Sequence, residues 1–326
     1  MLEEQNQAVA LHRAGRLDEA EAIYRRILKA DPDNAEVLQL LGVVAGQRGD
    51  NDECIRLIER AISREPEVPK YHANLGAALR ELRRLDEAAQ AFGRAVALDP
   101  SWELPAYFLA ALTGETMPAA PASCLQEIFD SYAGYFENYM VQELQYQVPT
   151  FIRGLVGRLM EPGRRFDKVI DLGCGTGLSG VQFRDAARCV HGVDLSPRMI
   201  EESEKKNVYD RLEVANIQDF LSAPGTRYDL FIATDVFIYI GALEGIFAAI
   251  SQRAERNALF AFSTEICEGD DYVLTATGRY AHSRPYVEGL ARENGFRVGA
   301  REQVPLRLES GQPVMGDIYV LRFDSP

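Results

Sequence analysis

The sequence predicts an α-solenoid of helical repeats followed by an α/β domain with a mostly parallel sheet. Two observations predict this division. A six-residue pattern recurs every 34 residues in the first third of the chain, and an apolar run at 169–172 ends in three alternating glycines. The chain has 326 residues, of which 47% are apolar and 26% charged, so it is long enough for two globular cores.

The repeats occupy residues 1–102. Each copy carries Asp-Glu followed by a small residue, and an Asp-Pro or Glu-Pro pair follows at the same period. The copies lie at 15–20, 49–54 and 83–88, and the proline pairs at 31–32, 65–66 and 99–100. This pattern resembles tetratricopeptide repeats, which implies three helical hairpins that form a binding or packing surface. A capping helix over 101–112 completes a predicted domain of residues 1–112.

A linker is predicted at 113–123, where small residues surround Pro118 and Pro121. The α/β domain then spans 124–326. Its apolar run at 169–172 is a buried strand, and a second apolar run ends at Asp194. Glycines after the first strand let the backbone approach a ligand, and Asp194 can accept hydrogen bonds from both hydroxyls of a ribose. This pattern indicates a nucleoside cofactor.

The glycine spacing distinguishes between cofactors. Dinucleotide sites use G-x-G-x-x-G, whereas this chain has G-x-G-x-G after the acidic Asp171. A carboxylate there suits a cationic amino group better than a pyrophosphate, which favours S-adenosylmethionine (SAM). The alternative is a purely structural glycine turn. The run Asp-Leu-Gly-Cys-Gly-Thr-Gly at 171–177 resembles the first motif of class I SAM-dependent methyltransferases, and 192–199 resembles their second motif.

The resemblance implies a Rossmann-like fold with seven strands, including strands near 212–214, 228–233 and 257–264. A terminal hairpin at 298–308 and 314–323 would end in an antiparallel strand. SAM would be the cofactor and S-adenosylhomocysteine (SAH) the product. The implied cofactor-binding residues are Tyr132, Asp171, Gly173, Cys174, Gly175, Gly177, Asp194, Leu195, Met199, Asn216, Ile217 and Asp235.

Three of these assignments have open alternatives. Asn216 stands where related enzymes commonly carry an acidic residue that accepts the adenine amino group, and Asp219 is either a second acceptor or a helix cap. The aromatic segment 124–161 resembles a helical lid, but its side chains equally suit core packing; Tyr132 is the one placed against the cofactor. Asp235 holds the cofactor's amino group, shapes a loop or touches the substrate.

Catalytic residues are sought after the fifth strand, where class I enzymes line the acceptor pocket. His282 lies there within 278–285 and is the candidate general base or substrate ligand, with Tyr280 as a weaker neighbour. The alternative is a helix-capping or surface histidine.

Composition restricts the partners. A net charge of −14 disfavours nucleic acid, no apolar run reaches the ~18 residues of a membrane span, and no signal segment is evident. Five scattered cysteines indicate a reduced cytoplasmic protein without a metal site. We expect a bacterial-type protein. We expect methyl transfer to oxygen or nitrogen of a small molecule or sugar-bearing precursor. The alternatives are methylation of a protein docked by the repeats, and a non-catalytic SAM-binding scaffold.

Overall fold

A computed structural model describes residues 2–161, 163–309 and 311–324, and only the backbone of Tyr132. The chain divides into two compact units. The first comprises Met1–Thr116 with Thr275–Gly278, and the second comprises Met117–Leu274 with Arg279–Pro326.

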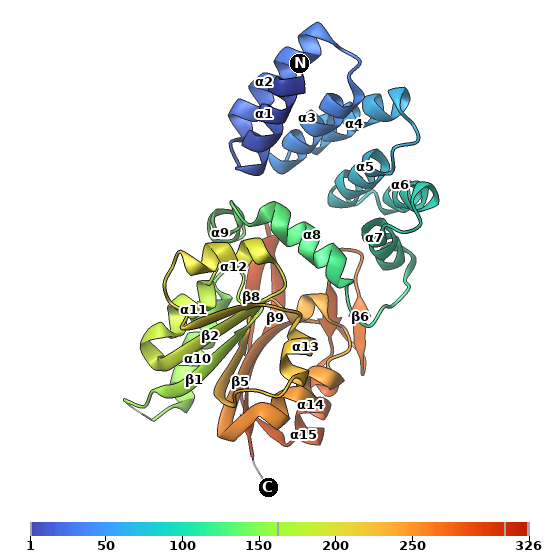
Figure 1. The fold of residues 1–326 in the computed structure, drawn as a ribbon. Helices are drawn as coiled ribbons and strands as arrows, with labels where there is room; N and C mark the ends of the chain where they lie inside the picture. The colour runs from blue at the N-terminus through green and yellow to red at the C-terminus, as the bar shows by residue number, and fades with distance from the viewer. Residues whose placement is uncertain (1, 162, 310, 325–326) are drawn as a thin grey trace. The chain divides into compact units, whose positions relative to one another are not determined.

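The first unit contains three helical hairpins and a final helix, which confirms the predicted repeat fold. Its helices are α1 Leu2–Arg13, α2 Leu17–Ala30, α3 Ala35–Gln47, α4 Asn51–Arg64, α5 Pro69–Glu81, α6 Leu85–Leu98 and α7 Glu103–Thr113 (Figure 1). The two helices of a hairpin touch where one carries glycine: a Cβ on Gly76 would lie 2.9 Å from the Phe92 ring. The capping helix begins at Glu103 rather than at 101, because Asp99 accepts hydrogen bonds from the backbone and hydroxyl of Ser101.

The second unit is built on a sheet that has nine strands in the described ranges. They are β1 Phe166–Leu172, β2 Ala187–Asp194, β3 Arg211–Val214, β4 Tyr228–Ala233, β5 Ala254–Ile266, β6 Tyr272–Leu274, β7 Tyr280–His282, β8 Phe296–Glu309 and β9 Gln312–Phe323. The main path is β3-β2-β1-β4-β5, and β9 joins β5 antiparallel and carries β8. These are the seven predicted strands. The short β6 and β7 were not predicted. The strand β7 pairs with Glu265 and Ile266 at the end of β5, and Glu265 also pairs with Gly316 of β9.

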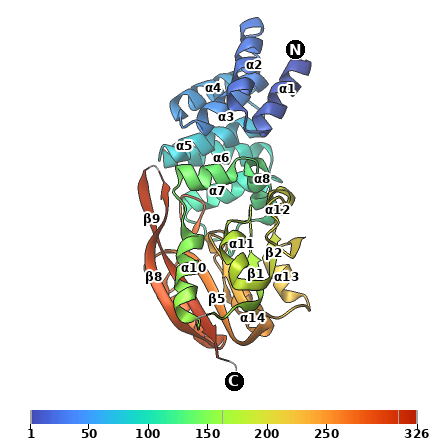
Figure 2. The ribbon, with the colours of Figure 1, turned by 90° about the vertical axis from the view of Figure 1, so that its left-hand side faces the viewer.

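Helices cover both faces of this sheet. The helices α10 Val148–Leu159 and α11 Leu178–Phe183 pack on one face, and Figure 2 shows α10 lying along β8 and β5. The helices α14 Glu244–Arg253 and α15 Arg284–Glu293, with the short α13 Ile217–Ser222, pack on the other face. The carboxyl ends of β1, β2 and β4 remain for a site, as is usual in open α/β sheets.

The segment 124–161, which was predicted to form a lid, is mostly helical. It contains α8 Ala122–Tyr132, α9 Phe136–Asn138 and a π-helical turn, Tyr139–Glu143, before α10. The second half of the predicted linker also belongs to this unit. Ala120 donates its backbone N–H to the Tyr239 carbonyl at 2.9 Å, and Pro118 accepts from the Gly241 N–H at 2.9 Å. Residues 117–121 are therefore attached to the α/β fold.

Candidate cofactor and acceptor site

The glycine loop after β1 adopts a backbone conformation that favours glycine. Gly173, Gly175 and Gly177 have φ angles of +69°, +53° and +92°. A Cβ on Gly173 would also lie 2.5 Å from a methyl carbon of Val236, in the loop after β4. The Gly173 and Cys174 N–H groups both donate to the Val193 carbonyl, so the loop is fixed to the end of β2.

Asp194 lies beside this loop at the end of β2. One of its carboxylate oxygens accepts the Gly175 N–H at 2.8 Å, and the other accepts the Ser196 N–H at 2.9 Å. Burial raises the pKa of this carboxyl group. Each oxygen has a further lone pair, so the geometry is compatible with accepting ribose hydroxyls. The structure thus brings together the two motifs that the sequence identified.

Asp171 is fully buried at the end of β1, and its Oδ2 accepts a hydrogen bond from the Tyr209 hydroxyl at 2.7 Å. Its Oδ1 is buried without a hydrogen-bond partner among the described residues. Burial raises the pKa of Asp171 to about 7. The Gly180 backbone N–H also interacts with this carboxyl group. A buried carboxylate with an oxygen that lacks a donor suits a bound ammonium group, so this site fits the amino group of SAM.

The other cofactor candidates surround the same strand ends. Met199 and Cys174 are buried, and Leu195 and Ile217 are partly buried. Asn216 uses its carbonyl oxygen to cap α13, accepting the Gln218 N–H at 2.8 Å. Asn216 is therefore the helix cap that Asp219 was considered for, and Asp219 lies inside the first turn of α13. The side chain of Tyr132 lies outside the described residues.

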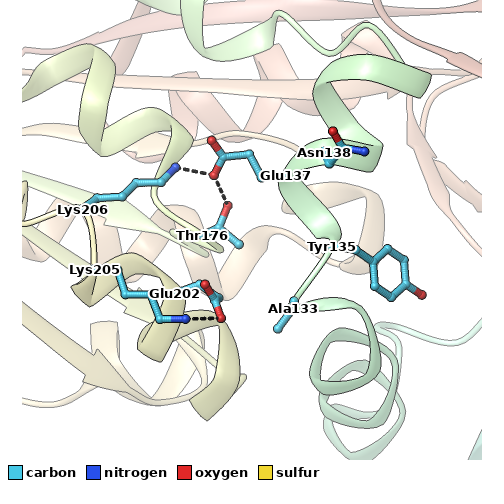
Figure 3. A pocket seen from close by; sticks show the side chains of 9 residues that line it. Ala133, Tyr135, Glu137, Asn138, Thr176, Glu202, Lys205 and Lys206 are labelled. Carbon is cyan, nitrogen blue, oxygen red and sulfur yellow. Dashed lines mark hydrogen bonds and ion pairs between the residues drawn. The ribbon is translucent and has the colours of Figure 1, made fainter. Parts of the chain in front are cut away.

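The lid contributes residues that the sequence did not identify. The Ser196 hydroxyl donates to Asp130 of α8 at 2.6 Å. Glu137 of α9 accepts hydrogen bonds from the Thr176 hydroxyl at 3.4 Å and from the Lys206 ammonium at 2.5 Å (Figure 3). Glu137, Thr176 and Lys206 line a cavity of about 220 Å³ between the lid, the glycine loop and the segment after β2. The sequence did not point to Asp130 and Glu137, because charged residues of a surface helix are ordinarily solvated.

His282 is neither exposed nor a helix cap. It lies on β7 with 1% of its surface exposed, and its Nε2 is 2.9 Å and 3.1 Å from the carbonyl oxygens of Ile240 and Gly241. The cap of α15 is Ser283. Burial lowers the pKa of His282 to about 4, so the ring is neutral at pH 7 and Nε2 carries the hydrogen. The neighbouring Tyr280 is fully buried.

Asp235 has a left-handed backbone, with φ +54°, and its carboxylate lies in a buried cluster of charges. Arg307 of β8 donates to it at 3.2 Å and also bonds to Glu265 and Glu309. The side chain of Arg307 is only 2% exposed. The sequence did not point to Arg307, because it lies 72 residues from Asp235 in an alternating strand.

No group of three His, Cys, Asp or Glu side chains that could hold a metal ion occurs in the described ranges. Within those ranges, too, no helix has the length and apolar character needed to cross a membrane.

Comparisons with known proteins agree with both halves of the chain. Residues 11–79 and 69–102 match tetratricopeptide repeat families, and residues 169–256 match a methyltransferase domain family. The chain therefore carries tetratricopeptide repeats and an enzyme domain of the SAM-dependent methyltransferase class.

Individual relatives of known activity share limited sequence identity with this chain. The magnesium protoporphyrin IX methyltransferase of Arabidopsis thaliana chloroplasts is 27% identical over 148 residues, which cover 41% of this chain and 47% of that protein. The magnesium-protoporphyrin O-methyltransferase of Synechocystis sp. is 28% identical over 148 residues, covering 40% and 63%. The alignment thus spans about half to two thirds of these relatives.

One solved structure shows the same fold. The 1,6-didemethyltoxoflavin-N1-methyltransferase of Burkholderia thailandensis has a TM-score of 0.50 and 17% identity, covering 65% of this chain and 94% of that one.

Proposed function

We propose that this protein binds SAM at the carboxyl ends of β1 and β2 and transfers its methyl group to oxygen or nitrogen of a small molecule or sugar-bearing precursor. The unpartnered Oδ1 of Asp171, buried beside the glycine loop, is the observation that carries SAM binding. Asp235 is a candidate to touch the acceptor, and its side chain and that of Glu265 are only 10% and 12% exposed. Carboxylates this buried are out of reach of a large partner, which favours a small acceptor.

Bound SAM supplies an electrophilic methyl group. The residues of this chain have the tasks of orientation and exclusion of water, which dominate the catalysis of such displacements. Asp194 would hold the ribose and Asp171 the amino group. The lid would cover the site through the contact of Glu137 with Thr176 and Lys206.

Titration calorimetry of the full chain with SAM and SAH tests cofactor binding. Asp194→Ala should weaken SAM binding at least tenfold, since bonds to an ionised acceptor contribute ~1.5–3 kcal/mol each. Glu201→Ala, which alters an exposed carboxylate on α12 Pro197–Glu204, is the matched control and should bind normally. Equal affinity in both variants would contradict the assignment of Asp194.

Incubation with methyl-labelled SAM and separated cell fractions tests the acceptor. Label in the small-molecule fraction supports the proposal. Label in protein alone supports a protein acceptor, and SAM binding without transfer to any fraction supports a non-catalytic scaffold.

We also propose that the repeat unit binds a protein partner. The cations Arg13 and Lys70 both lie within electrostatic reach of His12, which is 2.9 Å from Gln47 of α3. The positive charges of Arg13 and Lys70 favour a partner with acidic side chains.

A cytoplasmic setting is proposed as well, supported by five free cysteines, which a reducing compartment maintains.

A further inference from the structure

A buried charge cluster lies next to the proposed cofactor site, in the second unit. Its anions are the buried carboxylates of Asp235 and Glu265 and the partly exposed carboxylate of Glu309, and its centre is the Arg307 guanidinium. Arg279 joins it through an ion pair with Glu309. Among the described residues in these ion pairs, Glu309 and Arg279 are 32% and 26% exposed and pair with each other. The buried carboxylates of Asp235 and Glu265 then share the one buried guanidinium of Arg307, which leaves one buried negative charge in excess.

The cluster adjoins the glycine loop. Val236 follows Asp235 in the chain and lies so close to Gly173 that a Cβ on this glycine would clash with it. The buried Tyr146 hydroxyl lies within electrostatic reach of both Asp171, on the cofactor side, and Asp235 and Arg307, in the cluster. Asp235 therefore lies close to the glycine loop, where SAM would bind in the site proposed above.

The backbone of Asp235 is held in an unusual conformation. A non-glycine residue at φ +54° is uncommon and persists only when its surroundings fix it. Ser263 of β5 does so from both sides, because its hydroxyl accepts the Asp235 N–H at 2.9 Å and donates to Oδ1 at 3.2 Å. Arg307 holds Oδ2. The carboxylate is thus oriented before any ligand arrives.

The guanidinium of Arg307 is unsuited to binding an anionic acceptor. Its Nε and Nη2 atoms donate to Glu309 at 3.1 Å and 3.0 Å, Nη2 also to Glu265, and Nη1 to Asp235. A carboxylate or phosphate on the acceptor would have to displace these carboxylates. A buried uncompensated negative charge is unfavourable, and a cationic ligand relieves it.

We propose that the methyl acceptor is a small-molecule amine, which enters as an ammonium ion and is recognised by Asp235 and Glu265 while Arg307 acts as their positioning residue. This inference rests on the proposed function and names its substrate class. Burial raises the pKa of Asp235, which makes its carboxylate a better proton acceptor than a solvated one.

Methyl transfer to the amine would begin with the loss of a proton. The ammonium R–NH₃⁺ gives one proton to the Asp235 carboxylate and becomes the neutral amine R–NH₂. The nitrogen lone pair then forms a bond to the methyl carbon as the carbon–sulfur bond breaks, and its electrons remain on sulfur. The products are R–NH₂–CH₃⁺, the neutral thioether SAH and protonated Asp235, which returns its proton to solvent.

The first experiment uses the full chain, methyl-labelled SAM and a small-molecule extract separated by ion exchange. We expect label in the fraction retained by a cation exchanger, where amines collect. Asp235→Asn should reduce kcat/KM for the labelled compound by ~10²–10⁴ and remove the ionisation that governs its rise with pH. Glu255→Gln, an exposed carboxylate on the same β5 strand as Glu265, is the matched control and should leave turnover unchanged.

The second experiment does not depend on turnover. Benzyltrimethylammonium, which cannot be methylated, should bind the SAH-saturated protein in calorimetry, whereas benzoate should not. Asp235→Asn should weaken this binding at least tenfold. If that variant does not fold by circular dichroism, Glu265→Gln provides the same comparison.

The two proposals fail separately. Loss of SAM binding itself contradicts the proposed function. Normal SAM binding, with label only in neutral or anionic compounds or with no preference for benzyltrimethylammonium over benzoate, overturns the amine assignment.

Discussion

Asp171 shows how one residue can link cofactor affinity to pH. Its pKa of about 7 means that the free protein carries a neutral carboxylic acid below neutral pH. An ammonium ligand requires the ionised form, so the SAM dissociation constant should increase about tenfold for each pH unit below 7 and level off above it. Calorimetry between pH 5.5 and 8.5 measures this slope. Asp171→Asn should bind more weakly at pH 8 and lose the slope; a variant that keeps it would show that another group titrates.

His282 is a residue whose buried contacts predict a structural effect. Its Nε2–H serves the carbonyl oxygens of Ile240 and Gly241, so His282→Ala should destabilise the fold by ~1–3 kcal/mol. His282→Gln retains an N–H donor and should lose less. Urea unfolding followed by circular dichroism compares them. Equal stability of all three proteins would contradict the contact.

The same histidine predicts a pH dependence of stability. Its pKa is about 4 in the folded protein and near 6.5 when unfolded, so the unfolded chain binds the proton more readily. The contribution to stability is therefore complete above pH 6.5 and is lost as pH falls from 6.5 towards 4. Urea midpoints of the wild type should fall more steeply in this window than those of His282→Gln. A pKa this low also makes the ring a weak base at neutral pH, so a kcat profile of His282→Gln that matches the wild type would end its candidacy as general base.

At the scale of elements, the helix pairs of the repeats depend on close contact at glycine. A Cβ at Gly76 of α5 would lie 2.9 Å from the Phe92 ring of α6, and overpacking of this kind costs ~1–3 kcal/mol. Gly76→Ala should therefore lower the unfolding temperature of the repeat unit. Gly93→Ala on α6 is the control, because its Cβ would meet nothing within 4 Å and the change should be stabilising by ~0.5–1 kcal/mol. The opposite order of the two variants would refute this packing.

At the scale of the whole molecule, we expect cofactor binding to belong to the second unit alone. The proposed SAM residues all lie within Met117–Leu274, so a chain starting at Met117 should bind SAM with the affinity of the full protein. A chain starting at Ser123 lacks the hydrogen bonds of Pro118 and Ala120 to residues 239–242 and should be less stable. Calorimetry and thermal unfolding of both chains provide the measurements. Loss of SAM affinity in the longer one would show that the repeats take part.

The sequence by itself determined that a helical repeat domain precedes an α/β domain. Helical repeats and strand–glycine–helix units can be recognised from it because both are local patterns of residues close together in the chain. It also indicated Asp171, Gly173 and Asp194, since the roles proposed for them depend on spacing within one β-α-β segment. The sequence did not predict that Asn216 caps a helix or that His282 is buried. Their hydrogen-bond partners, the Gln218 N–H and the carbonyl oxygens of residues 240 and 241, are set by backbone geometry that the residue pattern does not reveal.

Only the tertiary structure decided the surroundings of Asp235. Arg307, Glu265 and Ser263 come from strands that are separated in sequence and meet because β9 pairs antiparallel with β5 and carries β8 beside it. The pKa of Asp171 and the unpartnered Oδ1 likewise arise from burial, which depends on every neighbour at once. Local pattern encodes backbone elements and the loops that join them, whereas the balance of buried charge is set by contacts between residues distant in the chain.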